Sequence, residues 1–332
     1  MPPFNAIRAA IARHKSFYIT THVGPDGDAT GPALALKIAL ENAGKRAVYV
    51  SRDGVPGSCR FLPRSDEVEP DVAIGERFDC AFVLDCDGTP GRVASRYDPI
   101  ETANERILID HHRTSQPIFE VNWLDPLKPA TAQMVYELLV ALQMPINSDM
   151  ATGLLTGLSG DTGHFRYPNT TPDCLRAAAH LVELGADIAL VAFKQYDERS
   201  FGSNKLLGVA MTQSKSEHDG ELIYTAISSR DYQSLGTGDE SSENIVNFLR
   251  NVRGARMAIC LRERRDETGP HARISVRSEE SLRADLFCNE FGGGGHAAAA
   301  GCRQGGEFLA IVTKVIRRAN QWLDEAHPPV PN

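Results

Sequence analysis

Residues 17–28 read FYITTHVGPDGD, an apolar run that ends in one histidine and two carboxylates. Two further short apolar runs end in the same kinds of residue. Ala81–Leu84 precede Asp85, and Arg106–Ile109 precede Asp110–His112. In a parallel α/β sheet, the side chains just past the carboxyl ends of neighbouring strands converge on one crevice. The repetition therefore predicts three parallel strands whose ends deliver charged groups to a common site.

The three strand ends together supply a set of groups that suits a metal centre: His22, Asp26, Asp28, Asp85 and His111. Carboxylates crowded without partners disfavour one another's ionisation, so divalent cations would resolve the conflict. Oxygen and imidazole ligands together favour hard and borderline ions. The alternative for Asp26 and Asp28 is that they cap the helix that follows and interact with its dipole.

The residues just after these strands differ in how strongly they point to function. Two adjacent histidines after a buried strand, His111 and His112, indicate that one binds a metal while its neighbour faces a substrate phosphate, and Asp110 is expected to orient a ligating imidazole. Asp87, beside Gly88 and Pro90, is interpreted as part of a solvated turn. Asp161, in the loop Gly160–Gly163, is a further candidate ligand, with a helix-ending turn as the alternative.

The first part of the chain alternates strands and helices. Helices are expected at 33–42, 130–142, 148–158 and 171–184, with a further strand at 47–50. This order predicts an α/β domain over residues 1–192, a mostly parallel sheet with helices on both faces. Residues 193–220 are interpreted as a linker. Strands at 221–227, 256–262 and 271–277, with helices at 282–291 and 307–322, predict a smaller α+β domain over 221–327.

The strongest feature of the second domain is the run Phe291–His296, which contains four consecutive glycines. Ordering them is costly, so a purely structural turn would rarely use so many. The run is expected to open into a helix at Ala297–Ala300, where backbone N–H groups would cradle phosphate and His296 would add a donor. A flexible linker is the alternative. Arg277 and Ser278, at the end of the preceding strand, are candidate anion ligands, although Arg277 as a solvated residue stays open.

The composition and charge of the chain argue against several classes of protein. The chain has 332 residues, 42% of them hydrophobic, and a formal net charge of −8. That charge argues against a track for long nucleic acid, which needs clustered Lys and Arg. No run is long enough for a membrane span and no signal peptide is evident, so a cytoplasmic protein is expected. The seven scattered cysteines indicate neither a disulfide framework nor a thiolate zinc site.

These motifs, in this order, resemble the DHH-family phosphoesterases with a DHH-associated C-terminal domain, in particular the NrnA-type group of nano-RNases and 3′-phosphoadenosine 5′-phosphate (pAp) phosphatases. The similarity spans nearly the whole chain and rests on the residue runs 21–29, Asp85, 110–112, 160–163 and 292–296. Pro32 stands where the family often has Ser, which affects only a contact at the start of the helix.

The resemblance implies two manganese ions, or magnesium or cobalt in their place, with Asp85 bridging. One site would use His22, Asp26 and Asp85, and the other Asp28, Asp85, His111 and Asp161. It further implies that His112, with Asp110, acts on the scissile phosphate. The predicted substrate-binding residues are Arg277, Ser278, Gly293, Gly294, Gly295 and His296. A catalytic domain and a substrate domain facing each other across a cleft, and a homodimer, are also implied.

The expected activity is therefore two-metal hydrolysis of short oligonucleotides, of pAp, or of both. A phosphodiesterase of cyclic or linear diadenylate is the alternative enzyme, and a nucleotide sensor that binds without hydrolysis is the alternative from a different class. An inorganic pyrophosphatase fits less well because the glycine-rich segment resembles a nucleotide-handling domain. A processive exonuclease is disfavoured by the acidic balance.

Overall fold

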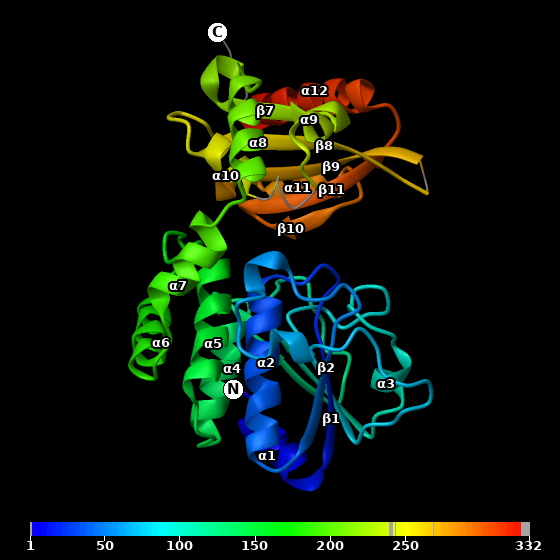
Figure 1. Cartoon of the computed structure of the whole chain (residues 1–332), viewed down its shortest axis with the longest axis vertical. Coiled ribbons are helices and arrows are strands. Elements are labelled where there is room, and N and C mark those ends of the chain that lie inside the picture. The colour runs from blue at the N-terminus through cyan, green and yellow to red at the C-terminus, as the bar shows by residue number, and fades with distance from the viewer. Residues whose placement is uncertain (1, 239–241, 243, 268, 327–332) are drawn as a thin grey trace. The chain divides into compact units, whose positions relative to one another are not determined.

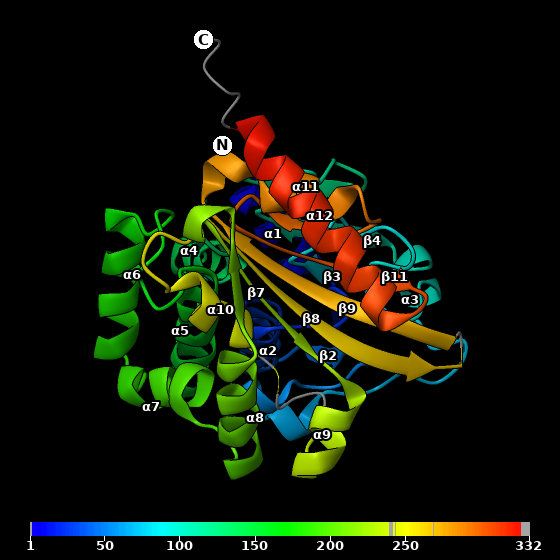
Figure 2. The ribbon, with the colours of Figure 1, turned by 90° about the horizontal axis from the view of Figure 1, so that it is seen from above.

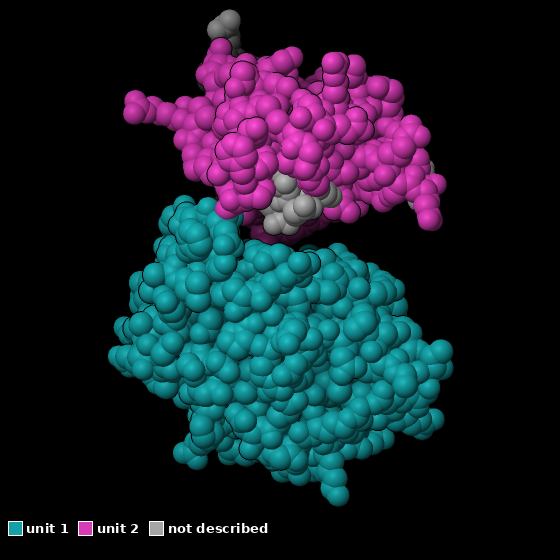
Figure 3. All heavy atoms as spheres, in the orientation of Figure 1, with its two compact units in different colours: residues 1–198 teal, residues 199–332 magenta. Residues whose placement is uncertain are grey.

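A computed structural model describes residues 2–238, 242, 244–267 and 269–326 of the chain. Contacts divide it into two compact units, Met1–Glu198 and Arg199–Asn332, coloured separately in Figure 3. Each unit has a sheet and a hydrophobic core of its own. In the part of the chain that the structure describes, no helix is long and apolar enough to cross a membrane. All seven cysteines are free thiols, and six of them are buried.

The first unit is built on a five-stranded sheet in the order β2-β1-β3-β4-β5, and each neighbouring pair is parallel. Its strands are β1 (Ser16–Thr20), β2 (Arg46–Val50), β3 (Cys80–Leu84), β4 (Glu105–Asp110) and β5 (Val121–Leu124). Every residue of β3 is buried, as expected for the central strand of a parallel sheet covered on both faces. The predicted α/β fold is confirmed.

Helices gather on one face of this sheet (Figure 1). They are α1 (Phe4–Arg13), α2 (Gly27–Asn42), α4 (Thr131–Ala141), α5 (Ser148–Asp161), α6 (Pro172–Glu183) and α7 (Ile188–Ala192), followed by a π-helical turn at Phe193–Asp197. The other face is covered by the short α3 (Asp98–Glu101) and by segments between strands, which include Val72, Phe78 and Val93. Two 3₁₀ turns, Gly57–Cys59 and Ser65–Glu67, lie between β2 and β3.

Helices α2 and α5 approach one another unusually closely. A Cβ on Gly31 would lie 2.0 Å from the carbonyl oxygen of Gly153, and a Cβ on Gly157 would lie 2.7 Å from the Asp28 carboxylate. Only glycine allows the two backbones this separation. The contact places the beginning of α2, with Asp28, against the last turn of α5, which ends at Asp161.

The second unit has a six-stranded mixed sheet in the order β10-β11-β9-β8-β7-β6. Its strands are β6 (Lys215–Glu217), β7 (Leu222–Ile227), β8 (Met257–Asp266), β9 (Gly269–Ser278), β10 (Gly294–His296) and β11 (Ala299–Gly305). One face packs on α11 (Ala284–Asn289) and on α12 (Phe308–Ala326), which crosses the sheet in Figure 2. On the other face lie α8 (Phe201–Thr212), α9 (Ser229–Leu235) and α10 (Ile245–Arg250). Short 3₁₀ turns occupy His218–Gly220 and Glu280–Leu282.

The glycine-rich run does not open into a helix, so that expectation is wrong. Gly294–His296 form β10, which turns back at Ala297 and Ala298 into β11 as an antiparallel hairpin. The close packing of the hairpin explains the glycines, because a Cβ on Gly293 would lie 2.2 Å from the Gly301 carbonyl oxygen and one on Gly295 2.5 Å from the Ala299 carbonyl oxygen. The predicted linker, 193–220, contains the π-helical turn, α8 and β6.

Candidate metal centre

The carboxyl ends of β1, β3 and β4 are neighbours in the sheet, as the sequence predicts. His22 lies two residues beyond β1, Asp85 directly follows β3, and Asp110 is the last residue of β4. The parallel pairing of Ile19 with Phe82, and of Leu84 with Ile109, aligns these ends. Three segments that are distant in sequence thus deliver their charged groups to one edge of the sheet.

Two helix ends complete the cluster. Asp26 is the N-cap of α2, because its side chain accepts hydrogen bonds from the backbone N–H groups of Asp28 and Ala29 at 2.9 and 3.1 Å. The capping alternative is therefore realised for Asp26, although capping occupies only one of its two oxygens. Asp28 is fully buried and accepts from the backbone N–H groups of Thr131 and Ala132 at 2.6 and 2.9 Å.

Two groups of candidate ligands share Asp85. In the first, His22 Nε2 lies 3.3 Å from Asp85 Oδ2 and 3.9 Å from Asp26 Oδ1. In the second, His111 Nε2 lies 3.1 Å from Asp161 Oδ2, 3.5 Å from Asp85 Oδ1 and 3.8 Å from Asp28 Oδ2. The two oxygens of the Asp85 carboxylate therefore face different imidazoles.

His112 and Asp110 form a separate pair beside these groups. His112 Nδ1 lies 2.7 Å from Asp110 Oδ1, and Asp110, which is fully buried, also accepts a hydrogen bond from the Ser115 hydroxyl. His112 Nδ1 lies 3.8 Å from Asp85 Oδ1. Asp110 therefore orients His112, whereas the carbonyl oxygen of Lys128 lies 3.1 Å from Nδ1 of His111.

Left-handed backbone conformations occur at Asp85 and just after α5. Asp85 has φ of +60°, and His164 and Phe165, after Gly163, have φ of +58° and +61°. A non-glycine residue in the left-handed region costs on the order of 1–3 kcal/mol and persists only where the surroundings impose it. At Asp85 this conformation turns the chain sharply at the end of β3.

The pKa values of the cluster follow from its crowding. Burial would lower the pKa of His22, but hydrogen bonds to Asp26 and Asp85 raise it to about 11. Burial would also lower the pKa values of His111 and His112. Hydrogen bonds to carboxylates outweigh burial and raise both pKa values, from Asp161 at His111 and from Asp110 at His112. Burial together with the charges of Asp85 and Asp161 holds the pKa of Asp28 well above its usual range.

The side chains brought together here include more carboxylates than imidazoles, so the cluster is rich in negative charge. Among the described residues of the first unit taken by itself, three overlapping groups have ligand atoms within 4.8 Å of one another: His22, Asp26 and Asp85; Asp28, Asp85 and His111; and Asp85, Asp110 and His112. Carboxylate oxygens and imidazole nitrogens are the donors that Mn²⁺, Mg²⁺, Co²⁺ and Zn²⁺ accept in proteins. The residues present therefore fit divalent cations, which would replace the protons that the imidazoles otherwise carry.

Sequence reasoning missed several supporting residues. The Thr131 hydroxyl donates to Asp85 Oδ1 at 2.9 Å, and the Asn169 amide donates to the Asp161 carbonyl oxygen at 3.0 Å. The Tyr196 hydroxyl, in the π-helical turn, donates to the Ser159 carbonyl oxygen at 2.6 Å. Thr131 begins the helix after β5, a position that could have been noticed, but no local pattern marks the others. Asp87 accepts from the Thr89 N–H and hydroxyl, in agreement with its interpretation as part of a turn.

In the second unit, the predicted substrate residues gather around the glycine-rich hairpin. Arg277 pairs in register with Ala299 and donates to the Asn247 side chain at 2.9 Å. The Ser278 hydroxyl is buried and donates to the carbonyl oxygens of Glu279 and Ala297 at 2.9 and 3.4 Å. Gly294, Gly295 and His296 are exposed, and Gly293 is half-buried.

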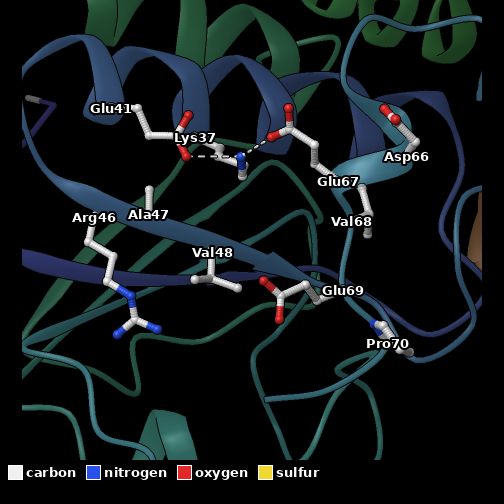
Figure 4. Close-up of a pocket in the computed structure, with 10 residues that line it drawn as sticks. All are labelled: Lys37, Glu41, Arg46, Ala47, Val48, Asp66, Glu67, Val68, Glu69 and Pro70. Carbon is white, nitrogen blue, oxygen red and sulfur yellow. Dashed lines mark hydrogen bonds and ion pairs between the residues drawn. The ribbon is translucent and has the colours of Figure 1, made fainter. Parts of the chain in front are cut away.

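A surface pocket elsewhere in the first unit contains none of the predicted site residues. It has a volume of about 600 Å³ and lies between α2, β2 and residues 66–70 (Figure 4). Lys37 beside it is nearly fully buried and bridges Glu41 and Glu67 at 2.9 and 2.6 Å. This arrangement indicates a structural ion-pair network that ties α2 to the segment after β2.

Comparison with known proteins identifies the family of the chain. Residues 16–158 match the model of the DHH family, N-terminal domain, and residues 219–325 match the DHHA1 domain. The chain is 36% identical over 311 residues to the bifunctional oligoribonuclease and PAP phosphatase NrnA of Thermus thermophilus, covering 93% of this chain and 90% of the relative. It is 27% identical to NrnA of Bacillus subtilis, covering 88% of this chain and 90% of the relative.

Two more distant matches are a relative that is named for a different activity and a solved structure. The chain is 23% identical to the cyclic-di-AMP phosphodiesterase PdeA of Listeria monocytogenes, covering 89% of this chain but only 46% of that protein. A crystal structure of an exopolyphosphatase-related protein from Bacteroides fragilis superposes with a TM-score of 0.87 at 23% identity, covering 96% of this chain and 95% of the other. At that identity the superposition supports the fold alone.

Proposed function

This chain belongs to the DHH family and carries a DHHA1 domain after its DHH domain, and we propose that it is a metal-dependent phosphoesterase that hydrolyses short oligonucleotides and pAp. The observation that carries the proposal is the shared position of Asp85, whose two carboxylate oxygens face the two groups of ligands. The NrnA relatives, named for oligoribonuclease and PAP phosphatase activity, support the choice of substrates.

Two divalent cations, manganese in our proposal, would be held by this unit's own side chains. His22, Asp26 and Asp85 would hold one, and Asp28, Asp85, His111 and Asp161 the other. When bound, such ions lower the pKa of a coordinated water and offset charge on the phosphate oxygens. Magnesium and cobalt accept the same donors, so the preferred ion is decided by assay.

His112 acts on the scissile phosphate in this proposal. Its Nδ1 is held by the Asp110 carboxylate, so Nε2 is the nitrogen that would contact the phosphate. Burial opposes protonation of His112, but the hydrogen bond to Asp110 raises its pKa and so favours the imidazolium form, which would donate to a phosphate oxygen. Ser115 fixes Asp110 in turn.

The second unit would bind the remainder of the nucleotide. Arg277 and His296 offer charged or polar groups to a phosphate or base, and Gly293, Gly294 and Gly295 allow close approach of the hairpin backbone. Because the Ser278 hydroxyl is committed to two backbone carbonyls, we assign it to holding the hairpin against β9. Assembly as a homodimer and a cytoplasmic location stay predictions.

The test is a panel of substrates with purified protein and added Mn²⁺, Mg²⁺ or Co²⁺. We expect phosphate release from pAp and mononucleotides from di- to tetranucleotides. An Asp85→Asn variant should lose at least a thousandfold in kcat while folding normally, because both ligand groups lose their shared carboxylate. Preference for linear or cyclic diadenylate would favour the alternative enzyme. Tight nucleotide binding without any product would favour a sensor and refute the proposal.

A further inference from the structure

Two cysteine thiols of the second unit contact one another beside the glycine-rich hairpin. Cys288 is on α11 and Cys302 is on β11, and the two thiols form a hydrogen bond with each other. Both are free thiols on the face of the sheet that packs on α11 and α12. Cys288 precedes β10 in the chain and Cys302 lies beyond the turn into β11, so the pair spans the hairpin.

Gly293, at the start of the hairpin, contacts both cysteines. Its backbone N–H donates to the Cys288 carbonyl oxygen at 2.9 Å. A Cβ on Gly293 would lie 2.4 Å from Cys302 Cβ and 2.7 Å from Cys302 Cα, so this position has no room for a side chain. Because the packing is this close, a change in the separation of the two cysteines also moves Gly293.

The two thiols differ in reactivity. The hydrogen bond from Cys288 lowers the pKa of the Cys302 thiol, although burial opposes this shift. The same hydrogen bond and burial raise the pKa of Cys288. Cys302 is half-buried, whereas Cys288 is fully buried. Since the thiolate is the form that reacts with oxidants, we expect Cys302 to react first and Cys288 to follow.

We propose that Cys288 and Cys302 form a reversible oxidation site, which closes as an intrachain disulfide in the presence of a hydroperoxide and displaces the glycine-rich hairpin. The closed loop, residues 288–302, contains all four glycines and His296. Formation of the disulfide is independent of the proposed function. Its effect on substrate binding rests on that function, because Gly293, Gly294, Gly295 and His296 are among the predicted substrate residues.

The oxidation proceeds in two steps. The Cys302 thiolate attacks one oxygen of hydrogen peroxide, the O–O bond breaks, and Cys302 becomes a sulfenic acid while the departing hydroxide takes up a proton to form water. The Cys288 sulfur then attacks the Cys302 sulfur, the S–O bond breaks, and the hydroxide leaves with the Cys288 proton as a second water. The two thiols together lose two electrons, and a dithiol returns them by thiol–disulfide exchange.

Mass spectrometry of the peroxide-treated, folded protein tests the first part of the proposal. Trypsin releases both cysteines in one peptide, residues 284–303, because no Lys or Arg lies between Arg283 and Arg303. We expect this peptide to lose two hydrogen atoms, to resist alkylation and to recover both thiols with dithiothreitol. Cleavage after Glu290 should give two fragments that stay joined until they are reduced. A peptide that keeps both thiols, or a bond from either cysteine to another, would overturn the proposal.

Three variants identify the order of the steps. Cys288→Ser keeps a hydrogen-bond donor beside Cys302 but cannot form the disulfide, so dimedone should trap a sulfenic acid on Cys302. Cys302→Ser should leave Cys288 unreacted, and a sulfenic acid on Cys288 would contradict the order. Cys260→Ala is the matched control, because Cys260 is equally buried on β8 but belongs to the core on the other face of the sheet. It should form the disulfide as the unmodified protein does.

Kinetics with pAp test the displacement of the hairpin. After oxidation and removal of peroxide, KM should rise about tenfold, as for the loss of one hydrogen bond to a phosphate. The change in kcat should be smaller, because every candidate metal ligand of our proposal belongs to the first unit. Dithiothreitol should restore KM, and peroxide should leave KM of Cys288→Ser unchanged.

The outcomes are distinct from those that test the proposed function. An unchanged KM in protein whose disulfide is complete would overturn the displacement of the hairpin. If the reduced protein hydrolyses neither pAp nor short oligonucleotides, the proposed function fails. The mass of the peptide 284–303 then still decides whether the oxidation site exists.

Discussion

The Thr131 hydroxyl holds the same Asp85 oxygen that faces His111. It donates to Asp85 Oδ1 at 2.9 Å, while the Thr131 backbone N–H donates to Asp28 at 2.6 Å. One residue at the beginning of α4 therefore holds a carboxylate from each of two distant segments. Hydrogen bonds of this kind orient metal ligands and are needed for full affinity.

We expect Thr131→Val to weaken Mn²⁺ binding about tenfold, because valine keeps the shape of the side chain but loses the donor to Asp85. The free energy of unfolding without metal should fall by only about 1 kcal/mol. Titration calorimetry measures the first quantity and urea unfolding the second. Thr152→Val, which removes a hydroxyl bonded within α5 to the Ser148 carbonyl, is the matched control. Equal metal affinity in both variants would contradict this role of Thr131.

At the scale of elements, the centre depends on how closely α2 and α5 pack. Gly31 and Gly153 face one another across this contact, with room for no Cβ on either. Since α2 carries Asp26 and Asp28 at its beginning and α5 ends at Asp161, any separation of the helices moves these ligands apart. The close packing of α2 against α5 is therefore needed to hold these candidate ligands in place.

Gly153→Ala should therefore lower the free energy of unfolding by about 1–3 kcal/mol, since the new Cβ would lie 2.8 Å from the Gly31 carbonyl oxygen. Gly208→Ala, in the interior of α8, is the control with the opposite sign. A Cβ there meets nothing within 4 Å, so the substitution should stabilise the protein by about 0.5–1 kcal/mol. Urea unfolding of both variants measures the difference, and a neutral Gly153→Ala would show that the helices adjust freely.

Some elements around the site could be predicted from the sequence and others could not. Strands that end in Asp85 and Asp110 were recognisable because buried parallel strands are continuous apolar runs, and the ligands follow them directly. The hairpin of β10 and β11 was mistaken for a helix start, because alanines after glycines carry a helical propensity that tertiary packing overrides. Thr131, Ser115 and Asn169 act through contacts between distant segments, which no local spacing reveals.

At the scale of the whole molecule, each of the two units has its own hydrophobic core and its own set of candidate functional residues. The first has clusters built around β1, β3 and β4 and carries every candidate metal ligand of our proposal. The second has clusters on both faces of its mixed sheet and carries Arg277 and the glycine-rich hairpin. A metal ion should therefore stabilise one unit directly and leave the other to its own interactions.

We expect calorimetric unfolding of the full chain to show two transitions, of which only one responds to Mn²⁺. At a concentration one hundred times the dissociation constant, binding contributes about 2.7 kcal/mol to the unit that holds the ion. For a unit of this size that corresponds to a shift of roughly 5–10 °C. Asp85→Asn should abolish the shift without moving the second transition, because Asp85 belongs to both ligand groups of the first unit. A shift of both transitions by the same amount would show instead that the ion stabilises the chain as one cooperative body.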